Sequence, residues 1–133
     1  MAKVELIDWM ICDDLRREDS GKLIYIGVYP ANDIVVGNIP VVLPKLVFST
    51  KWKMDKASKK YEFRVTSPDG VMVAQVSGEV PKTEVDRKVA YIQFGVVSFK
   101  IDVLGDYKVE GSVDGRDFEV GVFTVGQRKA VNS

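Results

Sequence analysis

The segment from Phe99 to Phe118 constrains the fold of this chain more than any other. Apolar and polar residues alternate on both sides of Gly105 and again on both sides of Asp114-Gly115. The pattern predicts a strand, a corner, a second strand, a tight turn and a third strand. Tyr107, two residues after Gly105, matches the tyrosine corner of immunoglobulin-like sandwiches, in which a phenol hydroxyl binds the preceding loop.

A second hairpin is predicted upstream. Residues 61–66 alternate Tyr, Phe and Val with polar side chains, and residues 71–76 follow after Ser67-Pro68-Asp69-Gly70. Pro68 presets φ for a type I turn, and Gly70 accepts the left-handed conformation that closes a short hairpin loop. The two segments are therefore expected to pair.

The remaining segments also favour strands. Extended structure is expected at Val4 to Cys12, Leu23 to Tyr29, Ile34 to Val36, Leu46 to Lys53 and Val89 to Val103. Pro30, Pro40 and Pro44 predict loops or short edge strands, and only Thr83 to Lys88 favours a helical turn. We predict an all-β fold, an immunoglobulin-like antiparallel β-sandwich of about seven to nine strands, with a small β-barrel as the alternative.

Length and composition fit one domain. The chain has 133 residues, of which 46% are hydrophobic, so residues 1–133 are expected to form a single β-sandwich domain around one core. Nineteen basic residues balance nineteen acidic ones. This balance argues against a nucleic-acid partner, because phosphate binding needs an excess of Lys and Arg.

The chain has no histidine, which excludes several kinds of chemistry. Ser-His-Asp and Cys-His catalysis and nearly all catalytic transition-metal sites depend on imidazole. We therefore expect no catalytic residue, no metal site and no cofactor, and a protein that is not an enzyme. Only carboxylate, lysine or tyrosine chemistry stays open.

The expected location is the cytoplasm. Glu5 and Asp8 interrupt the apolar stretch that a signal peptide needs, and no segment approaches the roughly twenty apolar residues of a membrane helix. Cys12 is the only cysteine, which fits a reducing compartment. Asp13 and Asp14 raise the expected pKa of its thiol, so Cys12 is predicted to be a buried or half-buried structural residue beside a solvated acidic hairpin loop.

The N-terminal hairpin has two apolar faces, where a sandwich strand should have one. We assign the aromatic set of Trp9, Tyr25 and Tyr29 to the core. The opposite faces are interpreted as a protein interface, formed with a second copy of the chain or with another protein. The predicted interface residues are Ile24, Ile26, Val28, Leu6 and Met10. The alternative is that the proline-rich residues 30–44 cover this face.

The segment from Lys45 to Lys60 holds six lysines against one acid, Asp55. It suggests a site for a small anionic ligand or nucleotide, with stacking on Trp52. The candidate contacts are Lys51, Trp52, Lys53, Lys56, Lys59 and Lys60. The alternative is that Trp52 faces the core and that the lysines protect an edge strand from aggregation.

Several motifs carry a family resemblance. They are Ile11-Cys12-Asp13-Asp14-Leu15-Arg16, Gly21-Lys22-Leu23, Ile26-Gly27-Val28-Tyr29, Pro40 and Leu43-Pro44-Lys45-Leu46. They resemble a family of small bacterial and phage-borne proteins of unknown function. The resemblance covers the first third of the chain well and implies a cytoplasmic β-sandwich with no assigned reaction.

Two functional hypotheses follow from these observations. The leading one is a non-enzymatic interaction module that self-associates or docks a protein partner. The alternative is a binder of a small anionic ligand or nucleotide through residues 45–60. A carboxylate hydrolase needs two acids in one cleft, and the sequence offers no such pair.

Overall fold

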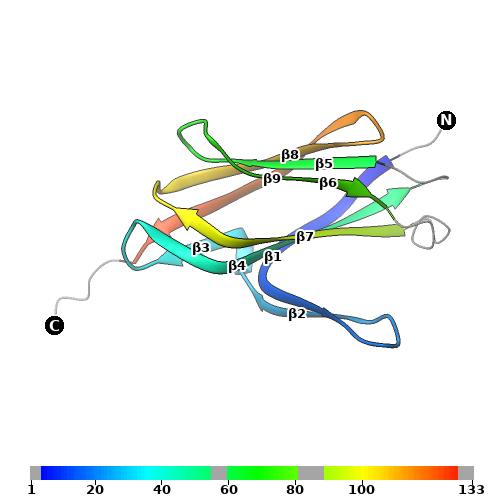
Figure 1. Ribbon diagram of the computed structural model, residues 1–133, viewed down its shortest axis with the longest axis horizontal. Helices are drawn as coiled ribbons and strands as arrows, with labels where there is room; N and C mark the ends of the chain where they lie inside the picture. Colours follow the sequence, from blue (N-terminus) through cyan, green and yellow to red (C-terminus); the bar gives the residue numbers. More distant parts are fainter. Residues whose placement is uncertain (1–3, 55–59, 81–88, 129–133) are drawn as a thin grey trace.

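Two β-sheets pack face to face in the computed structural model, which describes residues 4–54, 60–80 and 89–128 (Figure 1). Sheet A has the strand order β2-β1-β4-β7, and sheet B has the order β3-β9-β8-β5-β6. The strands are β1 (Val4–Arg17), β2 (Leu23–Val28), β3 (Asp33–Val36), β4 (Val41–Met54), β5 (Lys60–Thr66), β6 (Met72–Glu79), β7 (Val89–Ile101), β8 (Gly105–Val113) and β9 (Arg116–Gln127). A 3-10 turn at Pro30–Asn32 precedes β3.

The predicted all-β sandwich is confirmed, with nine strands in the described residues. All strand pairs are antiparallel except β3 and β9, which run parallel. The helical turn expected at Thr83 to Lys88 lies outside the described residues.

The two predicted hairpin turns have the expected backbone. Gly70 has φ of 84°, and its N–H donates to the carbonyl of Ser67 at 2.9 Å between β5 and β6. Asp114 and Gly115 have φ of 54° and 78° between β8 and β9. Two successive left-handed residues are what a two-residue hairpin turn requires, which explains the Asp-Gly sequence.

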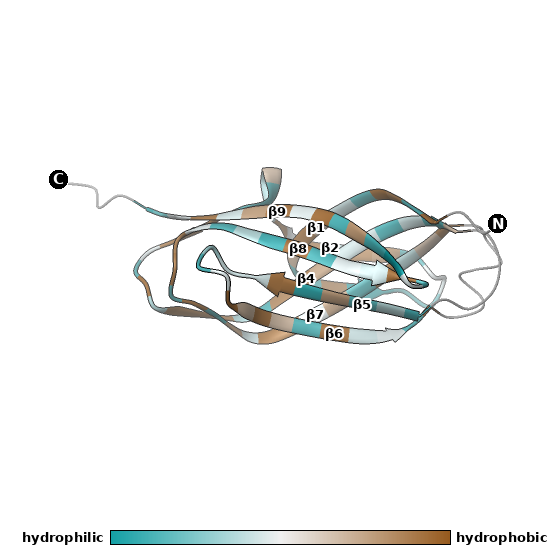
Figure 2. Ribbon diagram, turned by 90° about the horizontal axis from the view of Figure 1, so that it is seen from above, coloured by the Kyte–Doolittle hydropathy of each residue, from teal (hydrophilic) through white to brown (hydrophobic). Residues whose placement is uncertain are grey.

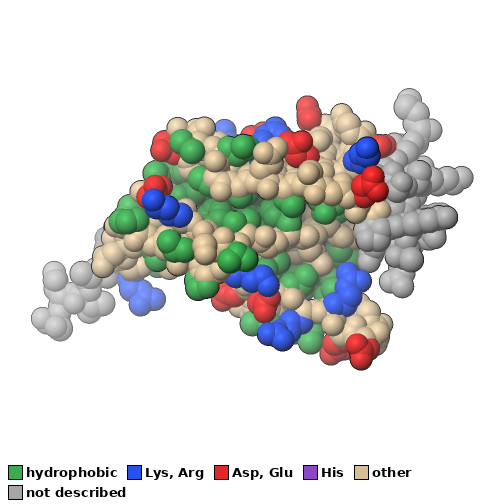
Figure 3. Space-filling model, viewed as in Figure 1, with side chains coloured by type: hydrophobic (Ala, Val, Ile, Leu, Met, Phe, Trp, Pro, Cys, Tyr) green, Lys and Arg blue, Asp and Glu red, His purple; other side chains and the backbone are tan. Residues whose placement is uncertain are grey.

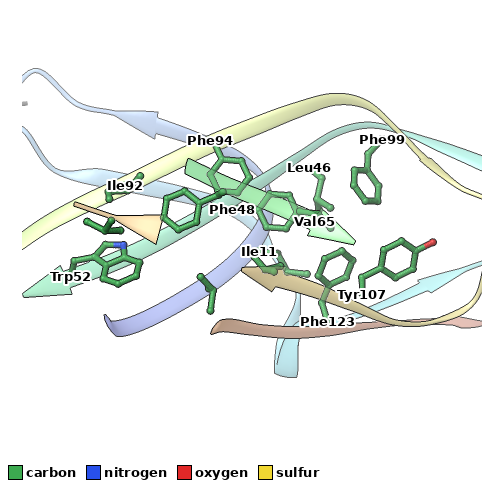
Figure 4. Close-up of a cluster of buried hydrophobic side chains, with 14 of the residues drawn as sticks. Ile11, Leu46, Phe48, Trp52, Val65, Ile92, Phe94, Phe99, Tyr107 and Phe123 are labelled. Carbon is green, nitrogen blue, oxygen red and sulfur yellow. The ribbon is translucent and has the colours of Figure 1, made fainter. Parts of the chain in front are cut away.

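The core lies between the sheets and is rich in aromatic rings (Figure 4). Phe48 of β4 stacks on Phe94 of β7 with ring centroids 4.8 Å apart. Trp52 is fully buried and meets Phe118 edge to face at 4.8 Å. The alternating hydrophobic and hydrophilic residues along the strands follow from one face packing on this core (Figure 2).

Pro44 lies inside β4, an inner strand of sheet A, and not in the loop or short edge strand that was predicted. It falls opposite Ser98 of β7, and this position is missing from an otherwise continuous register between the two strands. Proline has no N–H to donate to the ladder, and Ser98 has φ of 56°. The break exchanges the two faces of β7. Before it, even-numbered residues such as Phe94 face the core, and after it odd-numbered residues such as Phe99 do.

A β-bulge in β1 changes the predicted faces of this strand. The register with β4 shifts between Leu6 and Asp8, which leaves Ile7 exposed. Leu6 and Trp9 then both pack against the core, although a regular strand would place them on opposite faces. Trp9 is half-buried, and its indole lies against Gly121 of β9.

Candidate functional site

The β1–β2 hairpin curls beneath the outer face of sheet A (Figure 1). β1 pairs with β4 up to Cys12, and the strand then continues with β2 as its neighbour. We call residues 13–28 the hairpin arm. β1 thus extends to Arg17, beyond its predicted end, and places Asp13 and Asp14 within a strand and not in the predicted acidic loop.

Asp13 fixes the base of the hairpin arm. Its Oδ1 accepts a hydrogen bond from the hydroxyl of Tyr29 at 2.6 Å. Gly27, with φ of 68°, lies against the same carboxylate, and a Cβ at this position would approach its Cγ to 2.8 Å. Only glycine combines this backbone with this close approach, so Asp13, Gly27 and Tyr29 form one structural unit.

Asp14 ties the arm to β4. Its Oδ1 lies 2.8 Å from the ammonium of Lys45. The hydrogen bond from Lys45 is the main reason that the pKa of Asp14 is lowered. The acidic pair therefore orients the arm and does not form a reactive cleft.

Cys12 is buried at the point where β1 leaves β4, as predicted. Its thiol donates to the carbonyl oxygen of Asp14 at 3.3 Å. Desolvation, together with the neighbouring carboxylates of Asp13 and Asp14, raises the pKa of the thiol. A protonated, buried thiol is a poor nucleophile.

The outward side chains of β2 are apolar and open to solvent. Ile24 and Ile26 are each 41% exposed, and Val28 is 46% exposed. We call these three residues the arm patch. Residues 30–44 do not cover them, so the alternative of a covering loop is wrong. Leu23 and Tyr25 alternate with the isoleucines and are half-buried.

The other two predicted interface residues lie elsewhere. Leu6 packs against the core opposite Trp52, because the bulge at Ile7 reverses its face. Met10 is half-buried on the outer face of sheet A. Leu6 therefore does not join an exposed surface with the arm patch, and Met10 lies opposite Ser49 of β4.

Tyr25 does not join the core as predicted but reaches across to the outer face of sheet A. Its hydroxyl lies 3.0 Å from Oγ of Ser49 on β4. The amide of Gln93 on β7 donates to the same two hydroxyls at 3.4 and 3.3 Å. This polar network joins the arm to the sheet, and no alternation in the sequence indicated it.

A small depression of about 130 Å³ opens beside this network. It is lined by Asp8, Trp9, Met10, Tyr25, Ser49, Lys51 and Tyr91. The ammonium of Lys51 lies 5.8 Å from the centroid of the Tyr91 ring. The depression combines hydroxyl and ammonium donors with one carboxylate.

The predicted lysine site is not assembled as a unit. Trp52 is buried in the core, and its indole N–H donates to Thr50 at 2.6 Å, so it cannot stack on a ligand. Lys51 and Lys53 lie on β4, opposite Asp8 and Glu5 of β1, whereas Lys60 begins β5 in the other sheet. Lys56 and Lys59 lie outside the described residues.

The described part of the chain lacks two features, a metal-binding cluster and a membrane-spanning helix. Residues 4–54, 60–80 and 89–128 contain no group of three or more Cys, Asp or Glu side chains placed to hold a metal ion. No helix in this described part of the chain is long and apolar enough to cross a membrane.

Comparison with known proteins gives one family and a set of similar folds. A model of a family of unknown function (DUF6941) matches residues 7–125. No curated protein matches the chain. Among solved structures, the Pseudomonas fluorescens alkylpurine DNA glycosylase AlkC, bound to DNA containing an abasic site analog, aligns with a TM-score of 0.50 and 9% identity. The alignment covers 92% of this chain and 30% of that chain.

Two further structures are similar at a lower level. The C-terminal domain of wzt has a TM-score of 0.48 and 11% identity, over 96% of this chain and 75% of that chain. A Listeria innocua beta-glucosidase in complex with isofagomine has a TM-score of 0.47 and 13% identity, over 94% of this chain and 16% of that chain. The chain spans less than a third of the glycosylase, and identities this low concern the fold alone.

Proposed function

The chain belongs to the DUF6941 family of unknown function, and we propose that it is a non-enzymatic interaction module that self-associates or docks a protein partner. The observation that supports the proposal is the arm patch. Three large apolar side chains, Ile24, Ile26 and Val28, are exposed on one short strand of an arm that extends from the sandwich. Single exposed apolar residues are common, but a contiguous set marks an interaction surface.

The construction of the arm also supports an interaction role. The bonds of Asp13 to Tyr29 and of Asp14 to Lys45 hold the arm from its base, and Tyr25 holds it from its inner side. All three contacts leave the arm patch free. A surface that is held in place before binding loses less conformational entropy on association.

A charged substitution in the patch tests the proposal. Ile26→Glu should abolish self-association, or capture of a protein from a host lysate, while the melting temperature stays close to that of the wild type. Val122→Glu on β9 is the matched control, because Val122 is 40% exposed and Ile26 is 41% exposed. A monomeric wild type contradicts self-association. Equal protein capture by the wild type and Ile26→Glu contradicts partner docking.

A second candidate function is the binding of a small anionic ligand in the depression beside Tyr25. The hydroxyls of Tyr25 and Ser49 and the ammonium of Lys51 are donors on its lining. Asp8 opposes an anion there, and the volume is below the roughly 300 Å³ of ordinary ligand pockets. Inorganic phosphate should raise the melting temperature of the wild type but not of Lys51→Ala; equal shifts contradict this site.

We also infer a cytoplasmic location, an immunoglobulin-like type of sandwich and a bacterial or phage origin. The single free cysteine supports the cytoplasmic location, and the tyrosine corner at Tyr107 supports the immunoglobulin-like type of sandwich. The resemblance of the motifs around Cys12 and Gly21 supports the bacterial or phage origin. Fractionation of cells that express the chain from its own gene would test the location.

A further inference from the structure

β7 is an edge strand of unusual length. In the described residues it pairs with β4 on one side and has no strand on the other. The other three strands at sheet edges are shorter: β2 has six residues, β3 has four and β6 has eight, whereas β7 has 13. Each edge presents backbone N–H and C=O groups that can pair with another strand.

Residues 89–97 of β7 lack the features that usually protect an edge, and the left-handed Ser98 interrupts the strand just beyond them. Edge strands are normally short, charged or interrupted. β2 is interrupted by Gly27 in the left-handed conformation, and β3 is very short. Residues 89–97 of β7 carry no charged side chain and hold an unbroken register with β4. Few charged side chains lie over the middle of β7 in Figure 3.

We propose that the free edge of β7 pairs antiparallel with β7 of a second copy of this chain, which joins the two sheets A into one continuous sheet. A two-fold axis through Gly95, the midpoint of β7, pairs residues 93–97 of the two copies, which precede the left-handed Ser98. An antiparallel pair of identical strands satisfies a two-fold axis, because each residue contact is made twice.

The side chains on this edge suit a second copy. Tyr91, Gln93, Gly95 and Val97 lie on the outer face, beside the outer-face residues of β4. In the proposed register, Val97 lies opposite Gln93 of the second copy and diagonal to its Tyr91, within reach of an aromatic ring. Val97 is 73% exposed in the single chain, so this contact would cover a large apolar side chain.

The charges on the edge do not oppose pairing. Residues 93–97 carry no charge, and Lys100, the charged residue of β7, lies beyond the break at Ser98. No like charges on the two strands are brought opposite each other, and like charges directly opposite destabilise strand pairs. A second copy is therefore favoured over a charged peptide, for which the edge offers no complementary side chain.

This surface is separate from the arm patch. β7 and β2 are the two edges of sheet A, so pairing at β7 does not require the proposed function of the arm. If both surfaces self-associate, each molecule has two neighbours and the assembly grows along the sheet direction. If only one does, the product is a dimer.

The test is to place a charge on the edge. Val97→Lys should halve the mass of a dimeric wild type in size-exclusion chromatography with light scattering, without lowering the melting temperature. Val35→Lys is the control, because Val35 is also largely exposed but lies on β3 in the other sheet. Equal masses of the wild type and Val97→Lys would overturn the proposal, as would an equal loss of mass in Val35→Lys.

Hydrogen exchange of the wild type gives a second readout that does not depend on a variant. Pairing on both sides of β7 should protect consecutive amides of residues 93–97, whereas a free edge protects alternate amides only. An alternating pattern overturns strand pairing. Ile26→Glu changes the arm patch and should leave the protection of the β7 amides unchanged. The two interfaces are therefore tested separately, the arm patch by the effect of Ile26→Glu and the edge by the protection of β7.

Discussion

The hydroxyl of Tyr107 donates a hydrogen bond to the backbone carbonyl of Val103 at 2.7 Å. Tyr107 is the third residue of β8. Its ring is buried and stacks on Phe123 with the ring centroids 5.1 Å apart. In Figure 4 its hydroxyl points away from the aromatic cluster toward the edge of the core. One side chain thus joins the turn before β8 to the packing between the sheets.

Tyr107→Phe keeps the ring and removes this hydrogen bond. We expect the free energy of unfolding to fall by about 1 kcal/mol, because the carbonyl of Val103 loses its partner. Urea denaturation monitored by circular dichroism measures the change. Lys108→Ala, at the exposed neighbouring position, should be close to neutral. A Tyr107→Phe variant as stable as the wild type contradicts the role of the corner.

Tyr29 should make stability depend on alkaline pH. Burial, followed by the hydrogen bond to Asp13, raises the pKa of Tyr29 to about 12. The phenol of the unfolded chain has a pKa of about 10, so the folded state favours the protonated form. Its contribution is complete below about pH 10 and is lost as pH rises through about 12.

The comparison with Tyr29→Phe isolates this contribution. The wild type should be more stable than the variant up to about pH 10, and the difference should shrink between about pH 10 and about pH 12. Groups common to both proteins cancel in the difference. Urea midpoints across this range measure it. A difference that stays constant up to pH 12 contradicts the link between Tyr29 and Asp13.

Cys12 should be inert in the folded protein. The thiol is buried and its pKa is raised, so its thiolate population at neutral pH is small. We expect almost no reaction with a disulfide reagent such as DTNB in native buffer and one equivalent in denaturant. Cys12→Ala should lower stability, since it removes a buried side chain. Rapid labelling of the native protein contradicts this placement.

The turns could be predicted from the sequence because their causes are local. Gly70 and Asp114-Gly115 adopt the left-handed conformations that their residue types favour, and the hairpins follow from these turns. The burial of Cys12 was also predictable, because a lone cysteine packs as a small apolar residue and the adjacent Asp13 and Asp14 disfavour its thiolate. Such features depend on a few neighbouring residues.

The faces of β1 could not be predicted, because they depend on a bulge. One extra residue at Ile7 reverses the alternation, and nothing in residues 4–12 marks this position. The place of Pro44 inside a long inner strand could not be predicted either, because its partner Ser98 lies far away in the sequence. The contact of Tyr25 with Ser49 depends on the curl of the arm, which local patterns do not encode.

The position of β7 at a sheet edge could not be predicted from the sequence either. Its apolar sequence suits a central strand as well as an edge strand, and only the strand order shows which it is. Apolar residues that a sequence assigns to the core can therefore lie at an unpaired edge. Val97 is the clearest example in this chain.

Trp9 and Gly121 supply the last prediction, which tests how β1 packs on β9. A Cβ at Gly121 would lie 2.5 Å from Cζ2 of the Trp9 indole, so Gly121→Ala must displace the ring. We expect a loss of about 1 to 3 kcal/mol and a red shift of tryptophan fluorescence as the indole becomes more exposed. Gly126→Ala on the same strand is the control, because a Cβ there meets nothing within 4 Å.

In a Trp9→Ala background the cost of Gly121→Ala should largely disappear, because the two changes affect one contact. If the cost stays the same in that background, the strain at Gly121 comes from the backbone and not from the indole of Trp9.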